Sequence, residues 1–214
     1  MESDDTNEST ATRGLGDRPA SITDFDAAYE STPPWDIGYP QPALLALVEA
    51  GGLRGRVLDV GCGTGEHALL ASSLGFDATG VDSSSRAISM ARAKAQERAL
   101  DASFVVGDAL DLRFLDGPVD TVFDSGLFHV FDDEARARYV ASLARALSPG
   151  GQLFLLCFSD RVPGDFGPRR VSEGELRSSF AEGWHVLSLD LMRMIITLNP
   201  GGVDAWRAVI SRTD

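Results

Sequence analysis

Short apolar runs alternate along the chain with segments whose apolar residues recur at helical spacing, from about residue 43 onward. The runs at 56–60, 78–82 and 102–106 are typical of buried strands, and helical segments lie between them. Strands and helices that alternate in this way predict a parallel sheet with helices on both faces. The expected fold class is therefore α/β.

The same pattern places the remaining elements. We expect helices over 66–74, 85–99, 133–148 and 171–181, and further strands over 121–124, 152–158, 184–194 and 206–212. Ser172, with Glu175 three residues later, is typical of a capped helix start. The segments Pro149-Gly-Gly151 and Asn199-Pro-Gly-Gly202 are predicted to end a helix and to form a turn, respectively. The last two strands should then form an antiparallel hairpin that closes a seven-stranded, mostly parallel sheet.

The domain organisation follows from where hydrophobic periodicity begins. Residues 1–20 are polar and lack it, which predicts a disordered arm. Residues 21–214 are expected to form one domain, because 214 residues suffice for a single core and no internal repeat is present.

Charge and composition narrow the possible partners. The 19 basic and 32 acidic residues give a net charge of −13, which repels nucleic-acid phosphates and anionic membrane surfaces. The first residues are acidic and do not resemble a secretion signal, so a cytoplasmic location is expected. Cys62 and Cys157 show no metal-ligand spacing and are expected to be reduced thiols, and no metal site is predicted. The sequence does not indicate an oligomeric state.

The segment Asp59-Val-Gly61-Cys-Gly63-Thr-Gly65 follows a predicted strand and precedes a helix. Glycines let such a turn approach a ligand closely, and Asp82, at the end of the next strand, can accept hydrogen bonds from ribose hydroxyls. The spacing departs from the GxGxxG pattern of dinucleotide sites, and Glu66 would place a carboxylate near a pyrophosphate. A P-loop is excluded because the only lysine, Lys94, lies in mid-helix.

The segment from Val57 to Glu66 resembles motif I of class I S-adenosylmethionine-dependent methyltransferases. Further segments resemble the remaining family motifs, in the same order along the chain. They are Gly80-Val-Asp82 at the ribose position, Gly107-Asp-Ala109 at the adenine position, Phe123-Asp-Ser-Gly126, and Leu147-Ser-Pro-Gly-Gly151. The resemblance covers residues 40–214. It implies a Rossmann-like fold and S-adenosylmethionine as cofactor, with S-adenosylhomocysteine as product.

A further resemblance lies upstream, in Thr32-Pro-Pro-Trp-Asp-Ile-Gly-Tyr-Pro-Gln-Pro42. This segment is similar to one in thiopurine, thiol and halide methyltransferases and, more closely, in the mycobacterial heterocyclic-toxin and benzoquinone methyltransferases. It implies that residues 21–42 form a lid and that the acceptor is a small aromatic or heteroaromatic molecule, such as a hydroxyquinoline or hydroxyquinone, methylated on oxygen, nitrogen or sulfur. Detoxification is one expected role, and biosynthesis is the alternative that the sequence leaves open.

Site residues can then be assigned from the motifs and from the expected strand ends. The predicted cofactor-binding residues are Trp35, Asp59, Gly61, Gly63, Gly65, Asp82, Ser83, Asp108, Ala109 and Ser125. The predicted acceptor-binding residues are Tyr29, Tyr39, Phe128, Phe158, Arg161 and Phe166, and His129 is the candidate general base. Residues 161–170 are predicted to form a flap.

Each assignment has a plainer alternative. The glycines could form a tight turn without a ligand, Asp82 and Asp108 could cap helices, and Trp35 could be a core aromatic. At the level of the whole protein, the alternatives are a thiol or thiopurine S-methyltransferase and a non-catalytic S-adenosylmethionine-binding module. An NAD-dependent oxidoreductase is disfavoured by the glycine spacing and by Glu66.

Overall fold

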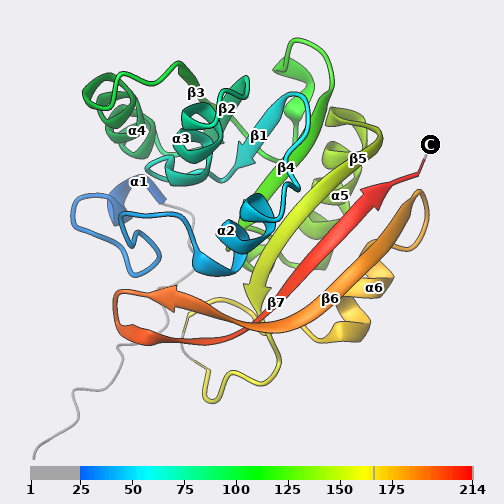
Figure 1. Cartoon of the computed structure of the whole chain (residues 1–214). Helices are drawn as coiled ribbons and strands as arrows, with labels where there is room; N and C mark the ends of the chain where they lie inside the picture. The colour runs from blue at the N-terminus through cyan, green and yellow to red at the C-terminus, as the bar shows by residue number, and fades with distance from the viewer. Residues whose placement is uncertain (1–24, 166, 214) are drawn as a thin grey trace, which may run out of the picture.

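A computed structural model describes residues 25–165 and 167–213; the predicted arm at 1–20 and Phe166 lie outside these residues. Within the described residues, seven strands form one sheet in the order β3-β2-β1-β4-β5-β7-β6 (Figure 1). Only the pairs β5–β7 and β6–β7 are antiparallel. The strands are β1 (Val57–Val60), β2 (Ala78–Asp82), β3 (Ala102–Val106), β4 (Val119–Ser125), β5 (Leu147–Phe158), β6 (Trp184–Ile196) and β7 (Asn199–Arg212). The predicted fold class, with its closing hairpin, is confirmed.

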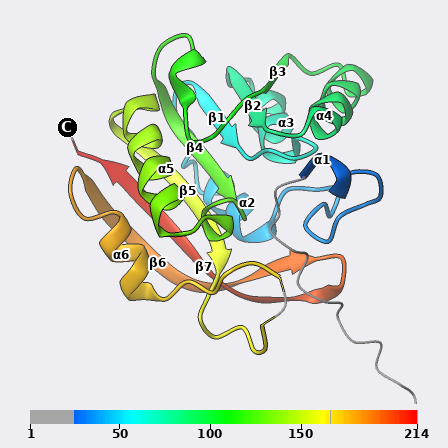
Figure 2. The ribbon, with the colours of Figure 1, turned by 180° about the vertical axis from the view of Figure 1, so that it is seen from behind.

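Helices cover both faces of the sheet, because successive side chains of a buried strand point to opposite faces. On β5, Phe154 and Leu156 pack on the face covered by α2 (Pro42–Glu49), α3 (Glu66–Ser73) and α4 (Ser85–Glu97). Leu153 and Leu155 pack on the other face, under α5 (Asp133–Ala146) and α6 (Glu173–Ser179). Figure 2 shows α5 and α6 from that side. In the described residues no helix combines the length and apolarity needed to cross a membrane.

The helix starts follow the predicted capping chemistry. The Ser84 hydroxyl accepts from the Ala87 amide at the start of α4. At the start of α6, Ser172 and Glu175 form the reciprocal capping box expected from their spacing. The short elements α1 (Phe25–Ala28), η1 (Leu112–Phe114) and η2 (Phe128–Val130) complete the chain.

Two predicted breaks lie inside strands instead. Helix α5 ends at Ala146, and the segment Pro149-Gly-Gly151 belongs to β5, where the register with β4 shifts between Val119 and Thr121. The segment expected to turn at 199–202 belongs to β7, and the hairpin turns at Thr197 and Leu198. Glycine and proline therefore mark irregular strand pairing at both places rather than the ends of elements.

The N-terminal segment 25–42 is fastened to the rest of the domain by side chains. Asp26 accepts hydrogen bonds from the Ser84 hydroxyl and from Arg86 at the start of α4. The buried Gln41 side chain forms two hydrogen bonds with the backbone of Ile195, donating to its carbonyl at 2.8 Å and accepting from its amide at 2.9 Å. The Thr197 amide also donates to the Pro34 carbonyl at 2.9 Å. The tip of the β6–β7 hairpin is thereby joined to residues 34–41.

The Gln41→Leu variant is expected to lower the free energy of unfolding by about 1–3 kcal/mol, because it leaves the Ile195 amide and carbonyl without partners inside the protein. Urea denaturation of the purified protein measures this. Gln96→Leu, on the exposed side of α4, is the matched control and should change the free energy of unfolding by less than about 0.5 kcal/mol. Equal stability of both variants would show that the Gln41 bridge contributes nothing.

Candidate active site

The turn between β1 and α3 bends where only glycine fits. Gly61, Gly63 and Gly65 have φ angles of 66°, 52° and 89°, in the left-handed region that other residues rarely adopt. A Cβ atom at Gly63 would lie 2.6 Å from the Tyr29 hydroxyl, and one at Gly65 would lie 2.6 Å from the Phe104 ring. Gly61 lines the cavity described below; among the described lining residues Gly63 and Gly65 do not occur. These two glycines shape the turn, and their contact with a cofactor stays a prediction.

Asp59 does not reach the cavity either. Its side chain is buried and accepts a hydrogen bond from the Ala68 amide at 3.1 Å, which fixes the first turn of α3. Burial raises the pKa of Asp59 to about 7. Its predicted role as a cofactor ligand is therefore replaced by a structural one.

Glu66 also faces away from the cavity. Its carboxylate accepts from Lys94 at 2.7 Å and from Arg98 at 2.8 Å, both on α4. Burial raises the pKa of Glu66, but the hydrogen bonds from Arg98 and Lys94 outweigh this and hold it below its usual value. Two cations thus balance the charge of Glu66, so the expected repulsion of a pyrophosphate by this carboxylate is weakened, and the glycine spacing is the argument against a dinucleotide that remains.

A cavity of about 510 Å³ opens at the carboxyl ends of β1, β2 and β4, where ligands bind in doubly wound sheets. Asp82 lies in its wall, where one carboxylate oxygen accepts from the Gly63 amide at 2.8 Å and the other from the Ser84 amide at 2.9 Å. Burial raises the pKa of Asp82. Of the other predicted cofactor residues, Trp35, Gly61, Ser83, Asp108, Ala109 and Ser125 also lie in the wall.

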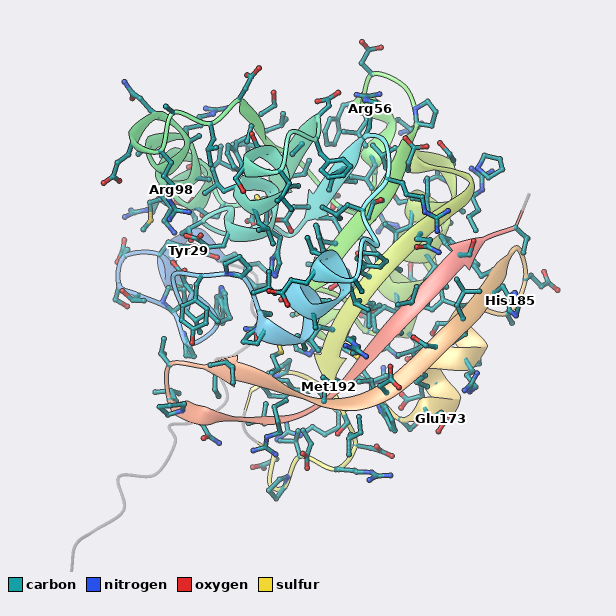
Figure 3. All side chains as sticks on the ribbon, viewed as in Figure 1. Tyr29, Arg56, Arg98, Glu173, His185 and Met192 are labelled. Carbon is teal, nitrogen blue, oxygen red and sulfur yellow. The ribbon has the colours of Figure 1, made fainter. Side chains whose placement is uncertain are left out.

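The N-terminal segment covers one side of this cavity. The Trp35 indole donates to the Tyr29 hydroxyl at 3.0 Å, and the two rings meet edge to face. Asp36 accepts from the Thr64 hydroxyl at 3.0 Å. Tyr29, labelled in Figure 3, therefore lies against the glycine turn, at the cofactor end of the cavity rather than at its acceptor end.

The other end of the cavity is apolar, and much of it was not predicted. Phe158 lies there as expected. It is joined by residues that sequence reasoning missed: Pro33, Pro34, Leu127, Val130, Phe131, Met194, Ile196 and Leu198. Met194, Ile196 and Leu198 occupy alternate positions that start at the end of the predicted strand 184–194 and continue past it. This spacing becomes informative only once the hairpin is known to reach the cavity.

His129 lies in the cavity wall, but its basic nitrogen is engaged. Nδ1 accepts from the Phe158 amide at 2.8 Å, so the ring proton is on Nε2, which lies beside Gly126. Burial lowers the pKa of His129 to about 3. The ring is therefore neutral at physiological pH and has no free lone pair, which argues against the predicted general base.

Three of the predicted acceptor-binding residues lie elsewhere. Phe128 is fully buried in the core, stacked on Phe180 with the Arg136 guanidinium 4.5 Å from its ring centroid. Within the tight helical turn η2, Phe128 and His129 point in different directions, so only His129 reaches the cavity. Tyr39 is 50% exposed, and Arg161 lies over the Trp206 ring; neither lines the cavity. Phe166 lies outside the described residues.

The predicted flap is held together by one side chain. Arg170 donates to the carbonyls of Val162, Pro163, Gly164 and Pro168. Gly167 and Pro168 line the cavity. The described part of the segment therefore contributes to the wall through these two residues.

Comparisons with known proteins agree with this geometry. Residues 57–151 match a family described as a methyltransferase domain. The chain is 40% identical over 165 residues to the 2-heptyl-1-hydroxyquinolin-4(1H)-one methyltransferase of Mycobacteroides abscessus, covering 76% of this chain and 73% of that protein. It is 33% identical over 145 residues to the probable thiol methyltransferase 2 of Arabidopsis thaliana, covering 66% of this chain and 64% of that protein.

A structure solved in work on the conversion of a disulfide bond into a thioacetal group during echinomycin biosynthesis is 41% identical. The two structures superpose with a TM-score of 0.81, and the superposed part covers 88% of this chain and 92% of the solved chain. The donor set in the cavity also fits S-adenosylmethionine, because Asp82 offers a carboxylate to ribose hydroxyls and the wall provides no cation for a pyrophosphate among its described residues. The chain belongs to the class I S-adenosylmethionine-dependent methyltransferases.

Proposed function

We propose that the protein methylates an oxygen, nitrogen or sulfur atom of a small aromatic or heteroaromatic acceptor, with hydroxyquinolones as the first candidates. The observation that carries this proposal is the apolar end of the cavity, next to the cofactor end and without lysine or arginine among its described residues. Such a wall suits a flat, uncharged molecule rather than a phosphate or a carboxylate. The hydroxyquinolone methyltransferase relative, at 40% identity, points to the same acceptor class.

The chain's own residues would hold both reactants. Asp82 would bind the ribose, and Asp108 and Ala109 would border the adenine. Trp35 would cover the methionyl part, with residues 25–42, the described part of the predicted lid, around it. Bound S-adenosylmethionine supplies a methyl group already activated by a positively charged sulfur. The apolar wall would hold the acceptor atom in line at about 3 Å and exclude water.

The acceptor is proposed to lose its proton to solvent rather than to the protein. The lone pair of His129 Nδ1 is engaged, so its role would be to fix the wall through the Phe158 amide. Acidic hydroxyl groups and thiols ionise in water near neutral pH and need no base. This also leaves room for a thiol acceptor, as the thiol methyltransferase relative suggests.

The remaining partners follow from charge and redox state. The net charge of −13 disfavours nucleic acid as a substrate. Cys62 and Cys157 are buried free thiols, which suits a reducing compartment such as the cytoplasm.

Asp82→Asn is expected to weaken binding of S-adenosylmethionine at least tenfold, because the ribose loses hydrogen bonds to a charged acceptor worth about 1.5–3 kcal/mol. Isothermal titration calorimetry measures the dissociation constant, and circular dichroism checks the fold. Asp101→Asn, at an exposed position outside the cavity wall, is the control and should bind as the unsubstituted protein does. Unchanged affinity of Asp82→Asn would remove Asp82 from the cofactor site.

The pH dependence of kcat/KM is expected to follow the pKa of the acceptor and not that of His129. Because the pKa of His129 is lowered to about 3, its charge does not change between pH 5 and 9. For hydroxyquinolones of different acidity, the midpoint of the rise in rate should shift with the acceptor.

The variant His129→Asn keeps an acceptor for the Phe158 amide and should retain activity within about tenfold, with His185→Asn, at the far end of β6 (Figure 3), as control. A general base, by contrast, contributes about 10²–10⁴-fold. A loss of that size, with the midpoint no longer tied to the acceptor, would restore the base role.

A further inference from the structure

The tip of the β6–β7 hairpin extends beyond the sheet. The last pair between β5 and β7 joins Phe158 to Ala205, whereas the pairing of β6 with β7 continues from there to Ile196 and Asn199. Residues 193–204 therefore form a two-stranded extension past the end of β5, and Figures 1 and 2 both show it below the N-terminal segment. The bonds from Gln41 to Ile195 and from Thr197 to Pro34 hold it in that position.

One side of this extension forms an apolar track in the cavity wall. Met194, Ile196 and Leu198 lie at alternate positions, and all three line the cavity. A Cβ atom at Gly126 would lie 2.9 Å from the Met194 methyl carbon, so Met194 reaches the carboxyl end of β4 next to His129. Met194 and Ile196 are about 7 Å apart along the strand, and Leu198 follows in the turn. The track therefore leads from the Gly126 end of the cavity to the hairpin turn.

Exposure increases along the track. Met194 and Ile196 are 2% and 6% exposed, whereas Leu198 is 58% exposed. Turns at hairpin tips favour glycine, asparagine or aspartate for conformational reasons, but this turn carries Thr197 and Leu198. Pro33 and Pro34 contribute further apolar surface to the same cavity. An apolar ligand group at the mouth would remove the exposed Leu198 side chain from water.

We propose that the acceptor carries an aliphatic substituent that lies along Met194, Ile196 and Leu198, and that Leu198 sets the preference for its length. This inference rests on the proposed function, because it assumes an acceptor that occupies the apolar end of the cavity. The aromatic part would lie inside, near His129 and Phe158, and the aliphatic chain would extend toward the hairpin turn. Each methylene taken out of water strengthens binding about fourfold.

The test compares 2-methyl and 2-heptyl forms of 1-hydroxyquinolin-4(1H)-one. Their dissociation constants are measured by calorimetry on the complex with S-adenosylhomocysteine, and their kcat/KM values with S-adenosylmethionine. The heptyl compound should bind at least tenfold more tightly than the methyl compound. Leu198→Ser should reduce that ratio three- to tenfold through weaker heptyl binding, and should leave the methyl compound within twofold.

Leu187→Ser removes a similarly exposed leucine from β6, 48% exposed and outside the cavity wall, and should leave the ratio unchanged. Equal affinities of the two compounds, or an equal effect of Leu198→Ser on both, would overturn the aliphatic subsite whether or not turnover occurs. Tight heptyl binding without methylation of either compound would instead overturn the proposed acceptor class and leave the subsite standing. Failure of both compounds to bind would overturn both.

Discussion

The sharp turn from β1 into α3 is the constraint on which the rest of the site depends. Three glycines with positive φ bring the chain so close to its neighbours that a single added carbon would collide with Tyr29 or Phe104. This closeness fixes α3 against the sheet and brings the Gly63 amide to the carboxylate of Asp82. Asp59, on β1, holds the first turn of the helix by accepting a hydrogen bond from the Ala68 amide. The polar end of the cavity is therefore set by backbone geometry more than by side-chain choice.

The acceptor end is constructed differently. Its walls come from parts of the chain that are far apart in sequence: the N-terminal segment, the loop after β4 and the tip of the C-terminal hairpin. The N-terminal segment and the hairpin tip are held together by a few hydrogen bonds, from Gln41 to Ile195 and from Thr197 to Pro34. A backbone framework at one end and a side-chain-dependent enclosure at the other would let relatives share a cofactor and differ in acceptor.

The strands, the closing hairpin and the glycine turn could be predicted from the sequence because each depends on local signals. Strand periodicity, the glycine turn and Asp82 at the end of β2 can each be recognised from a few neighbouring residues. The acceptor end was predicted less well, since side-chain direction depends on tertiary packing. Phe128 and His129 are adjacent, yet the first is in the core and the second in the cavity wall. Helix α2 was not predicted, because its short run of leucine, alanine and valine reads equally well as a buried strand. The reach of the hairpin tip could not be inferred, because its length depends on where β5 stops pairing.

The ion pairs behind the glycine turn have a consequence for chemical modification. Lys94 is the only lysine in the chain, and its amine bonds to both Thr64 and Glu66. Acetylation or amine-directed labelling has a single lysine to act on, and it lies directly behind the glycine turn. Neutralising that amine would leave Arg98 as the remaining cation on the carboxylate of Glu66, whose side chain is 9% exposed. The rate at which a lysine reagent modifies Lys94 would thus report whether the bonds to Thr64 and Glu66 behind the glycine turn are intact.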